Sequence, residues 1–264
     1  AERNHAKFTG LIIPNVFGPF GQPYYNSVVS TFCHQLTHGE QPRIEIDGNL
    51  KLIYVAELID YLFEKIDEHF AATSSNIVPQ PETCYLPHTA ETKVSDLLNQ
   101  LSDYKTLYFE QGILPDLQNP FDRSLFNTFV CYIDHASFFP FPLQLHTDER
   151  GSFFEIMKLH SGGQVSFSTT KVGVTRGNHF HTRKAERFAV IKGKAKIQMR
   201  RIGTNEVLSF EMDGDNPAFV DMPVWHTHNI TNSGDEDVYT LFWISEFYDP
   251  DDPDTYFANV NLPD

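Results

Sequence analysis

Two histidine-rich segments in the second half of the chain carry the residues best suited to metal chemistry. His179 and His181 are two residues apart, so on a strand both imidazoles face the same side. Glu186 can reach the same point from the next strand as a carboxylate ligand. His226 and His228 repeat the two-residue spacing further along the chain. Imidazole and carboxylate groups together suit zinc, iron, manganese or nickel, so the pattern predicts a metal site without choosing the metal.

Two other interpretations of these histidines compete with the metal site. A lone His-x-His pair on a strand is most often surface decoration, and a barrel can also carry the full pattern and work without a metal. The glutamate at a fixed offset and the second histidine pair favour the metal site.

The bulk composition narrows the class of protein. The chain has 264 residues, 41% of them hydrophobic, which is enough for one large domain or two ordinary ones with a real core. Its net charge of −15 disfavours nucleic acid as a partner. The three cysteines form no CxxC pair, which favours free thiols in a cytoplasmic protein. No apolar run is long enough to span a membrane.

The first half of the chain alternates between strand-like and helix-like patterns, which is typical of an α/β fold. An apolar run within residues 8–17 ends at Pro14 and predicts a buried strand of a parallel sheet. Further strands are expected at 43–46 and 51–55, and extended chain at 76–88. Helices are expected at 26–38, capped by Asn26 or Ser27, at 57–70 and at 92–101.

Helical periodicity disappears after a Pro- and Phe-rich stretch that we interpret as a linker at 127–140. Short alternating segments separated by Gly, Asn and Asp follow, which is typical of a β-sandwich or barrel. The expected strands are 152–159, 164–172, 186–191, 194–201, 206–212, 218–221, 227–231 and 238–245. The histidine pairs must be positioned by this second part of the chain, over residues 141–264.

The two histidine segments resemble the two cupin motifs. The first motif runs from Gly173 through the His-x-His pair and the glutamate to Gly193, and the second runs from Pro223 to Asn232. One departure is Trp225, which stands where the second motif usually has glycine and could narrow the barrel mouth. The resemblance implies a cupin barrel (a double-stranded β-helix or jelly roll). The metal ligands that it implies are His179, His181, Glu186 and His228.

The first half resembles the C-terminal, substrate-binding part of extended short-chain dehydrogenases, through residues 14–18 and 52–58. Together with the cupin motifs, and with matches at 23–28, 148–153 and 249–257, the chain is similar to one family. These are the bifunctional UDP-2-acetamido-2,6-dideoxy-hexulose reductases of capsule and O-antigen synthesis, which make UDP-N-acetyl-L-fucosamine. The resemblance therefore implies an α+β two-domain chain: a Rossmann-type dehydrogenase portion at 1–126, the linker, and the cupin.

The dehydrogenase part lacks its cofactor elements. No Gly-rich dinucleotide fingerprint is present. The Tyr-x-x-x-Lys pair at Tyr61 and Lys65 lies on the helix expected at 57–70, which follows the Val55-Ala56-Glu57 part of the segment 52–58. The catalytic pair of such reductases does not belong on that helix. We therefore expect this chain to be a fragment that begins inside or just after the helix bearing that pair. NADP(H) binding and hydride transfer are expected of the full-length parent alone.

The resemblance implies that the cupin epimerises carbon 3 of a UDP-linked 4-keto-6-deoxy-N-acetylhexosamine, and that the parent's dehydrogenase domain reduces the 4-keto group with NADPH. His226 and Tyr239 are the candidate bases, although His226 could be a rim residue or support a ligand, and Tyr239 could belong to the core. Candidate substrate contacts are Lys171 and Arg187 for the diphosphate, which could also point to solvent, and Asn15, Tyr24 and Asn26 for the sugar or cofactor side.

Three functions stay open at this point. The first is a keto-sugar epimerase with one divalent metal per cupin, zinc being the first expectation. The second is a cupin dioxygenase, against which the dehydrogenase-like first half argues. The third is a non-catalytic module for sugar binding or dimerisation. A homodimer is expected from the family, and neither nucleic acid nor membrane is expected as a partner.

Overall fold

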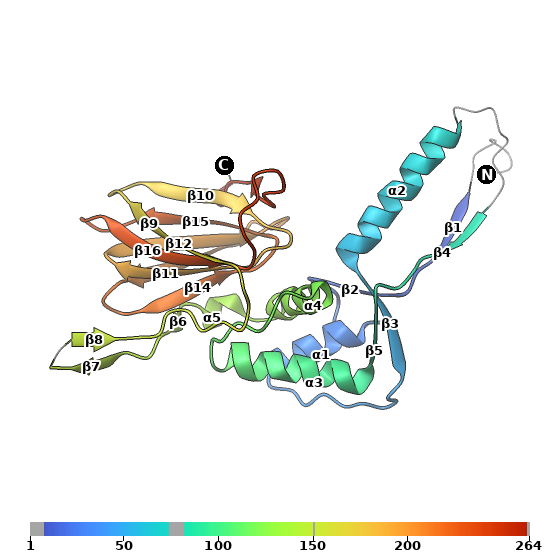
Figure 1. Cartoon of the computed structure of the whole chain (residues 1–264), viewed down its shortest axis with the longest axis horizontal. Helices are drawn as coiled ribbons and strands as arrows, with labels where there is room; N and C mark the ends of the chain where they lie inside the picture. Colours follow the sequence, from blue (N-terminus) through green and yellow to red (C-terminus); the bar gives the residue numbers. More distant parts are fainter. Residues whose placement is uncertain (1–7, 74–81, 150, 263–264) are drawn as a thin grey trace. The chain divides into compact units, whose positions relative to one another are not determined.

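The computed structural model describes residues 8–73, 82–149 and 151–262. The chain divides into two compact units, Ala1–Ser102 and Asp103–Asp264 (Figure 1). Within the described residues, no helix combines the length and the apolarity that crossing a membrane requires.

The first helix of unit 1 forms where the apolar spacing places it. Helix α1 (Val28–Thr37) begins after Ser27, whose side chain accepts a hydrogen bond from the backbone N–H of Ser30. Its buried apolar residues Val29, Phe32 and Leu36 fall on one face, as expected from the sequence. The prediction of a helix capped at this position is confirmed.

The remaining elements of unit 1 are short strands and two longer helices. Their bounds are β1 (Thr9–Ile12), β2 (Asn15–Phe17), β3 (Asn49–Tyr54), α2 (Val55–Thr73), β4 (Glu82–Tyr85), β5 (Ala90–Lys93) and α3 (Val94–Tyr104), the last of which continues into unit 2. Strands β1 and β4 form a parallel pair. Strand β3 pairs in parallel with β2 and antiparallel with β5.

Two expectations for unit 1 are corrected. Residues 43–46 form no strand, because all four side chains are exposed and none of the described strands pairs with them. The expected strand within 8–17 is divided at Pro14 into the two strands β1 and β2. Ile12, near its centre, is 51% exposed and not buried as expected. Among the residues that the structure describes, unit 1 has one sheet of two strands and one of three, which do not form a doubly wound sheet, so the dehydrogenase assignment stays a proposal.

The expected linker consists largely of helix. Unit 2 opens with a π-helical segment (Lys105–Phe109), followed by α4 (Pro120–Val130) and α5 (His135–Phe138). Asn119 caps α4 and Pro120 occupies its first turn, where a missing N–H costs nothing. The side chains of Phe126, Phe129 and Phe139 are buried, so this stretch packs as part of unit 2. The boundaries 1–126, 127–140 and 141–264 stay predictions.

The rest of unit 2 is a barrel of two antiparallel five-stranded sheets (Figure 1). One sheet has the order β13-β12-β15-β10-β17 and the other β6-β14-β11-β16-β9. Their bounds are β6 (Phe141–Pro142), β9 (Gln164–Thr170), β10 (Thr175–Phe180), β11 (Glu186–Lys192), β12 (Lys194–Arg201), β13 (Val207–Asp213), β14 (Ala218–Met222), β15 (His226–Asn232), β16 (Val238–Ile244) and β17 (Tyr256–Phe257). The all-β pattern expected beyond the helices is thus confirmed.

The strand expected at 152–159 is mostly absent. Only β8 (Gly151–Phe153) forms, and it pairs with β7 (His146–Asp148) in a hairpin that extends from the barrel (Figure 1).

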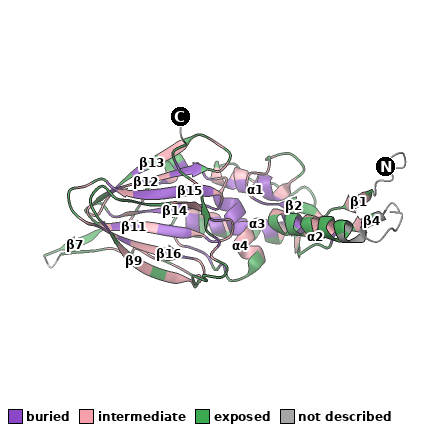
Figure 2. Ribbon diagram, turned by 90° about the horizontal axis from the view of Figure 1, so that it is seen from above, coloured by how far each residue is buried: buried purple, intermediate pink, exposed green. Residues whose placement is uncertain are grey.

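The barrel core is built from strands of both sheets. Buried residues line β14 and β15, which are largely purple in Figure 2. The core cluster includes Val190, Ile197, Met199, Val220, Met222 and Ile230. Because side chains alternate along each strand, every strand of the barrel presents one set of residues inward and the other outward.

Candidate metal centre

The structure brings the four expected ligands together inside the barrel. His179 lies on β10, His181 just beyond its end, Glu186 at the start of β11 and His228 on β15. One potential ligand atom of each lies within 4.8 Å of all the others. The group therefore joins the two sheets of the barrel, since β10 and β15 belong to one and β11 to the other.

A glycine two residues before the first histidine makes this arrangement possible. The register between β10 and β15 shifts between Gly177 and His179, which places His179 opposite His228. Gly177 has a φ of +104°, and a Cβ atom on it would lie 2.7 Å from the carbonyl oxygen of His228. Any other residue would force the two strands apart, so the glycine of the motif is required by this close approach.

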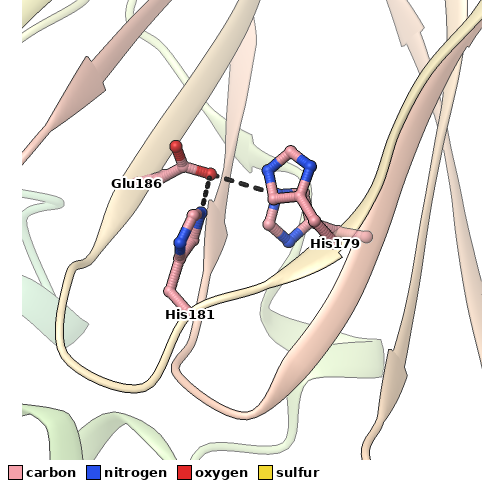
Figure 3. A group of neighbouring side chains, drawn as sticks. His179, His181 and Glu186 are labelled. Atoms are coloured by element: carbon pink, nitrogen blue, oxygen red, sulfur yellow. Dashed lines mark ion pairs between the residues drawn. The ribbon is translucent and has the colours of Figure 1, made fainter. Parts of the chain in front are cut away.

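The ligand atoms converge without satisfying one another. The Nε2 atoms of His181 and His228 each lie 3.0 Å from Oε2 of Glu186. Figure 3 shows His181 and Glu186 facing each other. These contacts are short enough for ion pairs, but none of the three buried atoms has a partner in hydrogen-bond geometry. Buried polar atoms are rarely left in this state.

The geometry fits a metal ion. Ligands of one ion, bonded at about 2.0–2.2 Å, lie roughly 3 to 4.4 Å apart, so the group needs only a small contraction.

The electrostatics of the cluster favour an ionised carboxylate among imidazoles. Burial alone would raise the pKa of Glu186, but contacts from His181 and His228 outweigh it and hold that pKa well below its usual range. Burial also lowers the pKa of His181, yet the Glu186 carboxylate raises it overall. For His179, burial and then the neighbouring His228 lower the pKa to about 4. A metal cation bound next to Glu186 would supply the positive charge that a protonated histidine otherwise supplies.

The tautomers of two ligands are set by backbone carbonyl groups. The Nδ1 atom of His181 lies within hydrogen-bond distance of the carbonyl oxygen of Asp254. The Nδ1 atom of His228 lies 3.1 Å from the carbonyl oxygen of His226. A carbonyl oxygen only accepts, so in each ring Nδ1 carries the proton and Nε2 presents its lone pair to the cluster.

His226 begins β15, two residues before His228, so strand alternation places both on the same face. Its Nδ1 atom lies 3.0 Å from the carbonyl oxygen of Val224, and its ring meets that of His135 edge to face at 5.2 Å. Burial, followed by His135, lowers the pKa of His226 to about 3. His226 is therefore a neutral, buried imidazole, and it faces the same interior as the ligands.

Tyr239 is corrected from a candidate base to a residue of the outer face. On β16, Phe242 and Ile244 stand opposite Phe188 and Glu186. Tyr239 is an odd number of residues from both, so it points to the other side of the sheet. There its ring packs against Phe167, which is 56% exposed.

Arg187 is also corrected, because it is part of the protein core. It is 1% exposed and follows Glu186 on β11, so it points away from the ligands. Its guanidinium donates to both carboxylate oxygens of Asp221 and to the carbonyl oxygen of Gly112. These contacts leave it buried under the helical segment of unit 2, with no surface for a diphosphate.

Lys171, the other expected diphosphate contact, is a surface residue beyond the end of β9. Its Nζ atom lies 2.6 Å from Oδ2 of Asp237, and the side chain is 77% exposed. It is not brought to the ligand cluster, because the pair lies where β9 ends and β16 begins, whereas Glu186 stands opposite Ile244 at the other end of β16.

The three other expected substrate contacts, Asn15, Tyr24 and Asn26, belong to unit 1. Asn15 begins β2 and is exposed. Tyr24 and Asn26 both adopt positive φ angles, of 60° and 53°, in the loop before α1. The hydroxyl of Tyr24 donates to Glu40, which raises the pKa of the tyrosine.

Two residues near the cluster were not predicted. Asp254 accepts a hydrogen bond from the backbone N–H of Lys184, in the loop between His181 and Glu186. Lys184 itself is 3% exposed. Both lie in segments that carry the family resemblance, but neither has a spacing that would single it out. Lys184 bears on His181 electrostatically, and its Nζ atom lies 5.8 Å from the ring centre of Tyr248.

Part of unit 2, and most of the chain, match known proteins. Residues 146–256 match the family described as "Polysaccharide biosynthesis C-terminal domain". The chain is 32% identical over 251 residues to the UDP-2-acetamido-2,6-beta-L-arabino-hexul-4-ose reductase of Pseudomonas aeruginosa, and is homologous to it. This match covers 94% of the chain and 64% of the reductase, so the chain spans a little under two thirds of that relative.

Two further relatives share parts of this similarity. The spore coat polysaccharide biosynthesis protein SpsL of Bacillus subtilis is 25% identical over 122 residues, which covers 42% of this chain and 81% of SpsL. The crystal structure of the capsular polysaccharide assembling protein CapF from Staphylococcus aureus is 34% identical, covering 94% of this chain and 70% of that one, with a TM-score of 0.47.

Proposed function

We propose that unit 2 is a metal-dependent cupin that epimerises carbon 3 of a UDP-linked 4-keto-6-deoxy-N-acetylhexosamine, within the synthesis of a capsular polysaccharide precursor. The observation that carries the proposal is the convergence of three imidazoles and one carboxylate in the barrel interior. The homology to a reductase of a UDP-linked 4-ulose supports the substrate class. The family description supports the role in polysaccharide synthesis.

The chemistry needs a way to acidify a carbon next to a ketone. A divalent metal held by His179, His181, Glu186 and His228 would supply Lewis-acid stabilisation of negative charge on the ketone oxygen. The proton leaves carbon 3, the electron pair moves into the carbon 3–carbon 4 bond and onto the oxygen, and a proton returns to the other face. The chain itself must supply the groups that hold and move this proton.

His226 is our proposed base. Its Nδ1–H is engaged by the carbonyl oxygen of Val224, which leaves the lone pair of Nε2 to accept a proton. A neutral ring on the ligand-bearing face of β15 is able to accept a proton from a substrate in the barrel.

Access to the centre is proposed to be from the side of His179. It is the half-buried member of the cluster, whereas the other three ligands are buried. An incoming ketone oxygen would therefore approach past His179. The metal is proposed to be zinc, which imidazole and carboxylate ligands suit.

Unit 1 is proposed to be the substrate-binding part of an extended short-chain dehydrogenase, with Asn15, Tyr24 and Asn26 as contacts. In the full-length parent, NADPH would reduce the 4-keto group after epimerisation. A cytoplasmic homodimer is proposed for the parent, as in the family that the chain resembles.

The decisive experiment follows solvent deuterium into carbon 3 of the UDP-linked 4-keto sugar by proton NMR, using the zinc-loaded chain. Loss of the carbon 3 proton signal is expected with zinc and not after chelation. The absence of exchange in protein shown to contain stoichiometric metal would overturn the epimerase proposal. Iron-dependent oxygen uptake would instead favour the dioxygenase.

A further inference from the structure

A single residue near the C-terminal end holds the loop that joins two of the ligands. The carboxylate of Asp254 accepts hydrogen bonds from the backbone N–H groups of Thr182, Arg183 and Lys184, at 3.0, 3.0 and 2.9 Å. It also accepts one from the hydroxyl of Thr182 at 2.7 Å. Both oxygens are thus occupied, and the residue is 3% exposed. Three consecutive amides converging on one carboxylate form a rigid anion-binding turn.

The same residue also contacts a ligand through its backbone. The carbonyl oxygen of Asp254 accepts the Nδ1–H of His181. The opposite atom of that ring, Nε2, faces Glu186 in Figure 3. Asp254 therefore holds one ligand by its carbonyl group and the backbone between His181 and Glu186 by its side chain.

The backbone conformation at this position suits aspartate. Asp254 has a φ of 40°, in the left-handed region that Asp and Asn tolerate better than most residues. The segment that follows is tied to the barrel, since β17 pairs with β10 at His179 and Phe180. In addition, Arg200 donates to the carbonyl oxygens of Asn259 and Val260. Asp254 is thus held in place beside His181, the ligand that it contacts.

We infer that Asp254 is a positioning residue of the metal centre, whose carboxylate fixes the path of the chain from His181 to Glu186. This inference rests on the proposed function, because it assumes that the cluster binds a metal. Groups that orient metal ligands in this way typically change metal affinity by about 10- to 100-fold when removed.

The test compares D254A and D254N with D251N in the full chain. Asp251 is exposed in the same segment, and D251N removes the same charge as D254N. Any long-range electrostatic effect on cation binding is therefore matched. Zinc affinity is measured by competition with a chromogenic chelator, and ligand geometry by the visible absorption spectrum of the cobalt-saturated protein. The spectrum at saturation reports the geometry of bound metal, which a loss of overall stability alone does not alter.

The expected result is a zinc affinity about 10- to 100-fold weaker for D254A, with an altered cobalt spectrum. D254N keeps one acceptor oxygen and tolerates the same φ. We therefore expect a smaller loss of zinc affinity, again with a change in the cobalt spectrum. If D254A does not fold, D254N alone provides the test. D251N should match the wild type in both. Wild-type affinity and an unchanged spectrum in the Asp254 variants would overturn the inference alone. Failure of the wild-type protein to bind zinc or cobalt would instead overturn the metal-site proposal beneath it.

Discussion

Arg187 and Asp221 form a two-point ion pair on the face of the sheet opposite the metal cluster. Nε of Arg187 donates to one carboxylate oxygen at 2.7 Å and Nη2 to the other at 2.8 Å. The hydroxyl of Tyr108 donates to the same carboxylate, and the guanidinium carbon lies 3.4 Å from the ring centre of Phe219. This pair fixes β11 to β14 one residue away from Glu186.

Breaking this pair from one side should destabilise the protein strongly. R187M leaves the Asp221 carboxylate buried without its partner, and the expected loss is about 3–5 kcal/mol of unfolding free energy. Urea unfolding of unit 2, followed by tryptophan fluorescence, measures it. The double variant R187M/D221L should recover part of the loss, because both charges are then removed. Equal stability of R187M and the wild type would show that the pair contributes nothing.

Removing a ligand should remove the metal. H228A takes one imidazole from the cluster, so zinc content after dialysis should fall sharply, and deuterium exchange at carbon 3 should be abolished. Elemental analysis measures the first effect and proton NMR the second. H146A is the control, because His146 lies on the exposed hairpin strand β7. Unchanged zinc content in H228A would refute the ligand assignment.

Exchange at carbon 3 should depend on His226 and not on Tyr239. H226Q is expected to retain metal but lose exchange by roughly 100-fold or more, the usual contribution of a general base. Y239F should exchange at the wild-type rate, since that ring lies on the outer face with Phe167. If H226Q keeps the wild-type rate at full metal occupancy, His226 is not the base.

The metal-free protein should lose stability on acidification below about pH 6.5. The pKa values of His135, His179 and His226 are lowered, that of His179 to about 4 and that of His226 to about 3, and these three groups outweigh His181, whose pKa is raised. The unfolded chain therefore binds more protons than the folded one as the pH falls from about 6.5 toward 3, which favours unfolding by up to about 1.4 kcal/mol per pH unit for each group. Urea unfolding of chelator-treated protein at several pH values measures the slope. H226Q should show a shallower slope, and an equal slope would exclude His226 as its source.

Trp225 should be better replaced by glycine than by alanine. Its φ is 61°, a conformation that glycine adopts without strain and other residues adopt at a cost of about 1 kcal/mol or more. W225G and W225A both lose the contact between the indole and Phe180, so their difference isolates the backbone. Thermal unfolding should give W225G a free energy of unfolding about 1 kcal/mol higher than that of W225A. The reverse order would mean that the backbone turns differently at this position.

The sequence was most informative where spacing and geometry coincide. The two-residue spacing of His179 and His181 and the turn to Glu186 are local, so strand alternation alone places them together. The strands β12 and β16 were likewise expected almost as they occur. The strand expected at 43–46 failed because alternation does not supply a partner strand.

Side-chain direction over longer distances could not be predicted. Tyr239 and Arg187 have suitable chemistry, but the register of β16 and β11 turns both away from the ligands. The role of Asp254 depends on a chain crossing from residue 254 back to 182, which no local pattern contains. The glycine that the second cupin motif usually has at position 225 indicates a left-handed backbone conformation, and Trp225 adopts that conformation.

The ligand cluster draws on strands from both sheets, and its last member, His228, lies far along the chain from the other three. A polypeptide in which β15 has not yet docked offers only three of the four donor groups. Binding of a metal by all four ligands therefore requires that the barrel has closed in the correct register. A bound ion would link the two sheets, which stabilises the folded barrel at equilibrium and slows the separation of the sheets.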